Sequence, residues 1–453
     1  MKVLKTVKIG IGAGVAVLVL PAAPAARAAA LVTVPCSGPA GGPAGLIAAI
    51  NSADNNGSAT INLAANCTYA LAAADNNSNG GNGLPVITSK ISLAGRDTVI
   101  AGNSSDFRIL EVDGPGGNLT LQGLTITGGD SVPASGGATA AGAGGGILND
   151  AGMLTLDSSR VTGNSAPGGG GGIATGTLGS GQAGTTTLND SRVTGNTASA
   201  GAGGGILNQA GTLLVNHSDV SGNTAGLGGG IATVTGTAGA TLTVTGSQVN
   251  DNAATAGGAG LAGGGIANGG TATIRASELR GNTASGGIGG GVLNFGVLTI
   301  TGSQLNSNEA PYNGSEASAG YGGGVANISF GVPDSGLLTV QLSAVSGNMA
   351  SDSGGGIFNS GASGSPATVT LDGVQVSANT ASVGGGVANQ GTLSVRGSLV
   401  TANNATLVSA QNPLGPRGGG IYNKGTATLA ASVVIKNLPD NCFPIGQLPG
   451  CSG

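Results

Sequence analysis

The chain has little of what ordinary globular cores are built from. It is 453 residues long, yet it has no tryptophan, only 2% aromatic and 8% charged residues, and 93 glycines. Too few large apolar side chains are present to fill a ball-shaped core of this size. Fifteen Lys and Arg against nineteen Asp and Glu leave no basic surface for nucleic acid. Any core must therefore be long and thin, and we expect no nucleic-acid partner.

Histidine and cysteine are also scarce. His217 is the single histidine, and the four cysteines are Cys36, Cys67, Cys442 and Cys451. Neither cysteine pair has the spacing of a zinc site, so we expect no metal and no cofactor. In an oxidising compartment the cysteines would form disulfides. Of the three pairings, we favour Cys36 with Cys67 and Cys442 with Cys451, because these pairs lie at opposite ends of the chain.

A hydrophobic run occurs only near the start of the chain. Lys2, Lys5 and Lys8 precede an apolar stretch from Ile9 to Leu20, which small residues follow. This order is typical of a secretory signal peptide, and the run is shorter than the roughly twenty residues that a membrane-spanning helix needs. We predict a signal peptide over residues 1–30, a secreted, extracellular protein, and no transmembrane segment in the mature chain.

What the sequence does have is a repeat. Three glycines, then Ile or Val, any residue, and Asn or Thr occur ten times, at intervals of roughly thirty residues. The copies end at Asn149, Thr175, Asn208, Thr233, Asn268, Asn294, Asn327, Asn359, Asn389 and Asn423. Alternating runs follow, with residues such as Leu213, Val215 and Val220 pointing inward. Three short strands per repeat predict an all-β fold, a single-stranded right-handed parallel β-helix of roughly 10–12 coils.

Polar columns recur with the same period. The asparagine column consists of Asn164, Asn196, Asn223, Asn252, Asn282, Asn308, Asn348, Asn379, Asn403 and Asn437. At a coil corner an asparagine tolerates left-handed backbone and can hydrogen-bond its equivalent one coil away, so we interpret this column as a structural ladder. The glycine triplets are interpreted as coil corners, because the Lys and the helix that a phosphate-binding loop requires do not follow them.

The two ends depart from the repeat. The segment Pro43–Asn51 places Leu46, Ile47 and Ile50 on one face and predicts a short helix that covers the first coil. We expect an N-terminal cap over residues 31–89, the β-helix over residues 90–437 and a C-terminal cap over residues 438–453.

Two families share these patterns. The motifs GGGILN, GGGIAN and GGGIFN resemble the repeats of chlamydial-type polymorphic outer membrane proteins. The stretch from NGLPVITSKISLAGRDTVIAG to NLTLQGLTITGG is similar to secreted right-handed β-helix repeat proteins of actinobacteria. The resemblance covers most of residues 36–437 and implies the fold. It implies little about function, because the same scaffold carries lyases, hydrolases and adhesins.

Enzymes on such a scaffold need clustered acids, and the acids here do not cluster. Asp157, Asp219, Glu278 and Asp372 fall at scattered positions, and we assign no catalytic residue. The leading hypothesis is a secreted, non-catalytic β-helix that presents an extended surface for adhesion or for binding a polysaccharide or cell-surface glycan. The alternative is an extracellular polysaccharide lyase or glycoside hydrolase of the pectate-lyase-like type. The oligomeric state stays open.

One coil carries two longer excursions. They bring aromatic and acidic residues near one strand, and the candidate ligand-binding residues are Tyr312, Glu316, Tyr321, Phe330 and Asp334. Aromatic rings stack on sugars, and a nearby carboxylate accepts hydroxyl protons.

A column of outward threonines raises a different possibility. It consists of Thr120, Thr155, Thr187, Thr243, Thr273, Thr299, Thr339, Thr370 and Thr428. A flat double row of threonines can order water and bind ice. Two residues further on, however, stand Asp157, Arg275 and Arg396, which break a second row there. Strand propensity accounts for a single column.

Overall fold

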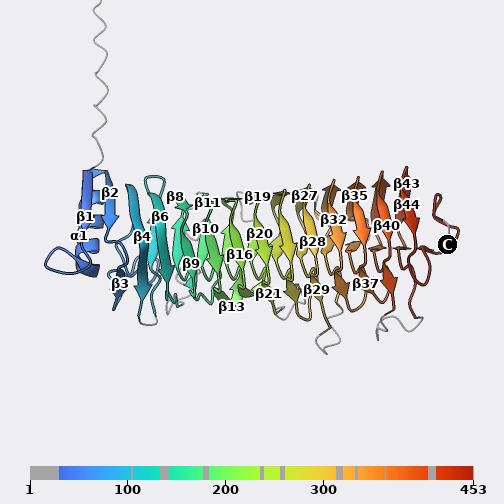
Figure 1. Cartoon of the computed structure of the whole chain (residues 1–453), viewed down its shortest axis with the longest axis horizontal. Coiled ribbons are helices and arrows are strands. Elements are labelled where there is room, and N and C mark those ends of the chain that lie inside the picture. Colours follow the sequence, from blue (N-terminus) through green and yellow to red (C-terminus); the bar gives the residue numbers. More distant parts are fainter. Residues whose placement is uncertain are drawn as a thin grey trace, which may run out of the picture.

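The computed structural model describes residues 30–103, 106–132, 142–176, 183–234, 239–255, 261–312, 320–331, 335–362, 364–406 and 415–451. Its coils stack along one long axis, with a single described helix at the N-terminal end (Figure 1). All strand pairings in the three sheets are parallel, and the solenoid has about 12 turns. The predicted all-β, right-handed parallel β-helix is thereby confirmed. The predicted signal peptide falls almost entirely outside the described residues.

The strand after each glycine triplet belongs to a 12-stranded sheet. In chain order its strands are β5 (Leu110–Asp113), β7 (Ile147–Asp150), β10 (Ile173–Gly176), β14 (Ile206–Gln209), β18 (Ile231–Val234), β22 (Ile266–Asn268), β26 (Val292–Asn294), β30 (Val325–Ser329), β34 (Ile357–Gly361), β38 (Val387–Asn389), β42 (Ile421–Asn423) and β45 (Cys442–Phe443).

The next two strands of each coil join one 25-stranded sheet. It begins with β1 (Ala30–Val34), β2 (Ser58–Leu63), β3 (Thr68–Leu71), β4 (Lys90–Gly102) and β6 (Asn118–Thr127). One column continues through β8 (Met153–Asp157), β11 (Thr185–Asn189), β15 (Thr212–Asn216), β19 (Thr241–Thr245), β23 (Thr271–Arg275), β27 (Val297–Thr301), β31 (Leu337–Gln341), β35 (Thr368–Asp372), β39 (Thr392–Arg396) and β43 (Thr426–Ala430). The other contains β9 (Arg160–Thr162), β12 (Arg192–Thr194), β16 (Asp219–Ser221), β20 (Gln248–Asn250), β24 (Glu278–Arg280), β28 (Gln304–Asn306), β32 (Ala344–Ser346), β36 (Gln375–Ser377), β40 (Leu399–Thr401) and β44 (Val433–Ile435).

A third column of short strands forms an 8-stranded sheet. Its members are β13 (Thr197–Ala202), β17 (Thr224–Leu227), β21 (Ala253–Ala254), β25 (Thr283–Ala284), β29 (Glu309–Ala310), β33 (Met349–Ala350), β37 (Thr380–Ala381) and β41 (Asn404–Ala405). Each complete coil thus closes around a narrow interior rather than a globular core.

Alternation along each strand builds that interior. In β15, Leu213 and Val215 are fully buried, whereas Leu214 between them is partly exposed. The register places Val215 between Leu188 and Val244 of the neighbouring coils. Like residues therefore stack on like along the axis, and the buried side chains form one continuous apolar rod.

The glycine triplets form one corner of each coil. The first glycine of every triplet has a φ between 60° and 82°, a region that favours glycine. The second glycine lies too close to the next coil for a side chain: a Cβ at Gly290 would overlap the backbone of Gly323 and Glu309. Since a side chain at either position is obstructed, the triplet is a requirement of the corner geometry.

The asparagine column is a continuous hydrogen-bonded ladder. From Asn164 to Asn437, each side-chain Nδ2 donates to the Oδ1 of the next asparagine at 2.9–3.0 Å. Asn437 then donates to Asn441 at 3.1 Å. Left-handed backbone was expected at these asparagines, but it belongs to the residue before, such as Ala378 (φ 55°) before Asn379. Because the turn is made one residue earlier, the asparagine can direct its amide into the stack.

A second ladder follows the glycine triplets. Asn268, Asn294, Asn327, Asn359, Asn389 and Asn423 are joined in the same way at 2.7–2.9 Å. Towards the N-terminus Thr175 and Thr233 interrupt it, and the Oδ1 atoms of Asn149 and Asn208 have no hydrogen-bond partner within the described part of the chain. This end of the second ladder is therefore incomplete.

Each end of the stack carries a disulfide, and a helix packs against the N-terminal end. Helix α1 (Gly42–Asn56) is longer than the expected Pro43–Asn51, and it buries Leu46 and Ile50 against the first strands. Disulfides join Cys36 to Cys67 and Cys442 to Cys451, the favoured pairing. Two formed disulfides fit an oxidising compartment.

Candidate functional site

Apolar side chains cover the outer face of the 12-stranded sheet as well as its inner face. In β30, Val325 belongs to the interior, whereas Ala326 and Ile328 belong to a separate cluster on the opposite face. We call this cluster the outer apolar stripe. It contains Ile288, Leu293, Phe295, Tyr321, Ala326, Ile328, Phe358, Val383, Ala388, Tyr422 and Phe443. It lies over the C-terminal half of the sheet. Nearer the N-terminus, the four strands β7, β10, β14 and β18 carry a similar cluster that contains no aromatic residue.

Two of the predicted ligand-binding residues, Tyr312 and Tyr321, lie against the same short segment, residues 351–353. The backbone N–H of Tyr312 donates to the Ser351 hydroxyl at 2.7 Å, and Tyr312 is 44% exposed. Tyr321 stacks on Phe358, with ring centroids 4.7 Å apart. Burial raises the pKa of the Tyr321 hydroxyl, and the neighbouring Asp352 carboxylate raises it further. The surroundings of this segment, which we call the Tyr312 corner, thus hold one exposed ring, one half-buried ring and one carboxylate.

That carboxylate has an open acceptor. Asp352 is nearly buried, and its Oδ2 accepts from the Ser353 hydroxyl at 3.2 Å. Its Oδ1 has no hydrogen-bond partner among the described residues. This oxygen is buried, so a ligand outside the coil does not reach it, and the Tyr321 hydroxyl is the polar group that lies against the carboxylate.

The third predicted residue lies at the other end of the same strand. Phe330 follows β30 and is 52% exposed, and its ring centroid is 6.1 Å from that of Phe295. Tyr321 precedes β30 and Phe330 follows it, so the two rings lie at opposite ends of the strand. The remaining two predicted residues, Glu316 and Asp334, lie outside the described residues.

The stripe continues towards the C-terminus with cations. Tyr422 and Phe443 stack with ring centroids 5.8 Å apart. Lys424 lies 5.4 Å from the Tyr422 ring and Arg417 lies 5.2 Å from the Phe443 ring. These contacts were not predicted from the sequence. Phe358 and Tyr422 both occupy the variable position of the glycine repeat, and this shared position could have indicated that their rings lie on the same face.

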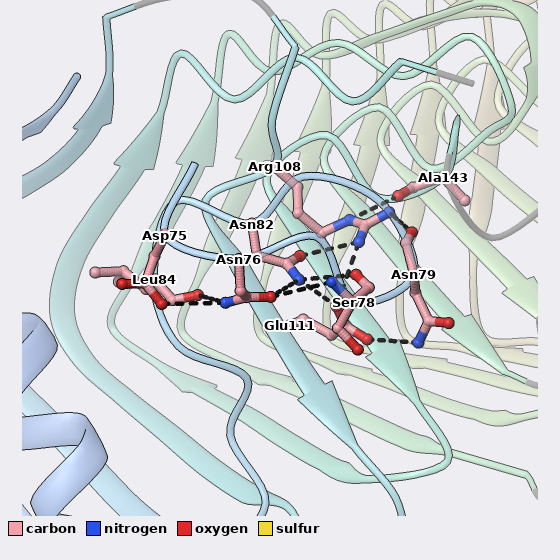
Figure 2. A network of polar contacts seen from close by, with 9 residues as sticks. All are labelled: Asp75, Asn76, Ser78, Asn79, Asn82, Leu84, Arg108, Glu111 and Ala143. Atoms are coloured by element: carbon pink, nitrogen blue, oxygen red, sulfur yellow. Dashed lines mark hydrogen bonds and ion pairs between the residues drawn. The ribbon is translucent and has the colours of Figure 1, made fainter. Parts of the chain in front are cut away.

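A buried ion pair occupies the opposite end of the same sheet. Arg108 and Glu111 are fully buried and 3.4 Å apart, and Glu111 aligns with Leu148 of the next coil (Figure 2). The Glu111 carboxylate accepts from Asn79 and Asn82, both at 2.6 Å. Burial raises the pKa of Glu111, although the Arg108 charge opposes the shift.

The arginine has its own set of acceptors. Arg108 donates to the Asn82 side chain at 2.9 Å, to the Asn79 carbonyl at 3.0 Å and to the Ala143 carbonyl at 3.2 Å. The loop around Asn79 and Asn82 is thereby fastened over the sheet, as Figure 2 shows. Glu111 is an acid with a raised pKa, but it is covered and paired, so a polymer at the surface does not reach it.

Across the residues that the structure describes, no three His, Cys, Asp or Glu side chains gather where they could hold a metal ion. Within the same residues, no helix has the length and apolar character needed to cross a bilayer.

Known proteins resemble the chain only distantly. No protein-family model matches it, and no curated protein matches its sequence. Among solved structures, the A-module of Azotobacter vinelandii mannuronan C-5 epimerase AlgE6 is similar at 15% identity, over 87% of this chain and 92% of that chain, with a TM-score of 0.35. The A-module of AlgE4 from the same organism is similar at 13% identity, over 90% and 95% of the two chains, with a TM-score of 0.37. Matches at this level carry no argument about function.

Proposed function

We propose that the protein is a secreted, non-catalytic solenoid that binds polysaccharide along the outer apolar stripe and serves adhesion. The observation that carries this proposal is the distribution of the aromatic residues. The chain has five Phe and four Tyr. Of these, Phe295, Tyr321, Phe330, Phe358, Tyr422 and Phe443 gather on one sheet face. Of the rings in this region, Phe330 is 52% and Tyr312 44% exposed, whereas Phe358 and Tyr422 are buried, so a polymer that follows the solenoid axis would contact the two exposed rings.

The chemistry of the Tyr312 corner supports the same ligand class. Sugar rings present C–H faces that pack on aromatic rings and hydroxyls that donate to carboxylates. Exposed Tyr312 supplies a ring that a polymer outside the coil can reach. Half-buried Tyr321 lies against Asp352, whose carboxylate is buried and supports the Tyr321 hydroxyl from behind.

The non-catalytic assignment is supported by where the perturbed acids lie. Glu111 is buried and paired with Arg108, and Asp440, whose pKa is also raised by burial, accepts from the backbone N–H of Gly418 at 2.7 Å. Acid–base cleavage of a glycosidic bond uses a pair of accessible carboxylates. Glu111 and Asp440 are instead engaged in contacts within the protein.

The test is binding to a glycan array and to insoluble polysaccharides by the wild type and the Tyr312→Ala/Tyr321→Ala double variant. The matched control is Met153→Ala, because Met153 is an exposed residue on the 25-stranded sheet. We expect the double variant to lose binding and the control to retain it, with both melting as cooperatively as the wild type. Unchanged binding by the double variant would remove the proposal. Release of reducing sugars or unsaturated products would favour the enzyme alternative.

A further inference from the structure

A second outer surface is built almost entirely from threonine. It is formed by the first and third residues of ten strands, β8, β11, β15, β19, β23, β27, β31, β35, β39 and β43, and we call it the threonine face. The first-residue column is Met153, Thr185, Thr212, Thr241, Thr271, Val297, Leu337, Thr368, Thr392 and Thr426. The third-residue column is Thr155, Thr187, Leu214, Thr243, Thr273, Thr299, Thr339, Thr370, Ser394 and Thr428.

The structure places a second row beside the threonine column, on its N-terminal side. Asp157, Arg275 and Arg396 follow the column two residues later and still break a row on its C-terminal side. The second row lies two residues earlier on each strand, as with Thr241 before Thr243. Seven positions of the first column and eight of the second are threonine, and none of the twenty is charged or carries an amide.

Register makes the two columns a lattice. Thr241 pairs with Thr271 and Thr243 with Thr273, and no bulge occurs in these pairings. Parallel strands lie about 4.8 Å apart, and alternate residues of one strand about 6.6 Å apart, so the side chains form a nearly rectangular grid. These repeats are similar in size to those between water molecules in hexagonal ice. In one pair of this grid the Thr241 hydroxyl donates a hydrogen bond to the Thr212 hydroxyl at 3.2 Å.

We infer that the threonine face binds ice. Each threonine offers a methyl group that packs against water without competing for its hydrogen bonds, and a hydroxyl that can take a place in the water lattice. Charged side chains would hold tightly bound water in a different arrangement, and the face has none. The ladder inside the coils keeps the grid rigid, because each ladder asparagine, such as Asn252, is hydrogen-bonded to the coils on both sides.

Strand propensity alone does not explain why the two columns are mainly threonine. It favours Val, Ile, Tyr and Phe as much as Thr, and it places no bar on exposed lysine or glutamine. On the neighbouring strands of the same sheet, outward positions do carry such residues, for example Gln248, Glu278 and Gln304. The selection for threonine is therefore confined to one face. It lies on a different sheet from the outer apolar stripe, so this inference is independent of the proposed polysaccharide binding.

The experiment measures thermal hysteresis and partition of the mature chain into a slowly growing ice crystal. The test variant is Thr243→Lys/Thr273→Lys, and the matched control is Gln248→Lys/Gln304→Lys on the neighbouring strands. We expect the wild type and the control to enter the ice fraction and to show hysteresis, and the threonine variant to lose both.

Three results would overturn the inference. They are absence of hysteresis and ice partition in the wild type, equal ice binding by the threonine variant, and ice binding that the control variant loses as well. Should the lysine variant fail to fold by circular dichroism, Thr243→Val/Thr273→Val replaces it, since valine keeps the strand and removes only the hydroxyls. Retention of hysteresis in that variant at the wild-type level would show that the hydroxyl grid is not needed and would equally contradict the inference.

Discussion

The hydroxyl groups of Thr175 and Thr186 lie 2.6 Å apart inside the solenoid. Both positions depart from the repeat: Thr175 stands where the second ladder has asparagine, and Thr186 stands where neighbouring coils have Leu154 and Leu213. Each threonine satisfies the other's buried hydroxyl. The pair leaves Asn208 with an orphaned Oδ1, because Thr175 has no amide to donate to it.

The double variant Thr175→Asn/Thr186→Leu should therefore be more stable than the wild type by about 1–2 kcal/mol, since it adds a buried hydrogen bond and apolar burial. Thr186→Leu alone should lose about 1–3 kcal/mol, because it leaves the Thr175 hydroxyl unpaired. Urea denaturation of the double variant and of both single variants measures the coupling energy between positions 175 and 186. If the effects of the two single changes add up to that of the double change, the two threonines are not coupled.

Leu342 is a non-glycine residue in left-handed backbone, with a φ of 48° and 73% of its surface exposed. Gly302 and Gly373 occupy the same corner in the adjacent coils at similar φ. We expect Leu342→Gly to stabilise the fold by about 0.5–1 kcal/mol, because relief of the backbone strain exceeds the entropy that glycine gains when unfolded. Leu342→Ala keeps the Cβ and should change little. Equal melting temperatures for these two variants would show that the corner is not strained.

Asn282 donates to the Val249 carbonyl at 2.8 Å and to Asn308 at 2.9 Å, and it accepts from Asn252. Replacing Asn282 with leucine should lower the free energy of unfolding by about 1–3 kcal/mol for each buried partner that is left without a hydrogen bond, and such partners lie on two neighbouring coils. Gln248→Leu, an exposed amide-to-leucine change, is the control and should alter stability by less than about 0.5 kcal/mol. A melting curve for Asn282→Leu that matches this control would contradict the ladder's role.

Arg108→Met should make stability strongly pH-dependent. Without the cation, burial raises the pKa of Glu111 further above its unfolded value. A carboxyl whose folded pKa is raised contributes stability that is present below its unfolded pKa and is lost as the pH rises through the folded pKa. The deficit against the wild type should therefore be smaller in acid, where only the hydrogen bonds to Asn82, Asn79 and Ala143 are lost, and reach about 3–5 kcal/mol at neutral pH.

The matched variant is Arg108→Met/Glu111→Leu, which places leucine where the next coil has Leu148. It should recover much of the loss at neutral pH and remove the pH dependence. Denaturation of both variants between acid and neutral pH provides the check. A deficit of Arg108→Met that stays constant with pH would contradict the assigned role of Glu111.

Sequence periodicity predicted the elements that repeat in every coil. Inward residues such as Leu213, the ladder from Asn164 to Asn437 and the glycine corners follow from contacts that each coil makes with its neighbours. Within such a stack, identical spacing guarantees identical surroundings.

Features that depend on unequal coils could not be predicted in the same way. The outer stacking of Tyr321 on Phe358 joins residues on two different coils at different distances from their glycine triplets. Arg108, Asn82 and Glu111 meet because a loop outside the repeat folds back over the sheet. The second threonine row lies two residues before the first on each strand, whereas the prediction from the sequence considered only the residues two positions after it. The observed strand bounds show that each strand begins early enough to include the second row.

The asparagine ladder also makes the length of the molecule adjustable. Every asparagine from Asn196 to Asn403 gives one amide hydrogen bond to the next coil and receives one from the coil before. A coil removed or duplicated as a whole would leave one donor facing one acceptor at the new junction, so the stack would close without redesign of either neighbour. A gene encoding this chain can therefore lengthen or shorten both outer faces one coil at a time while the caps stay unchanged.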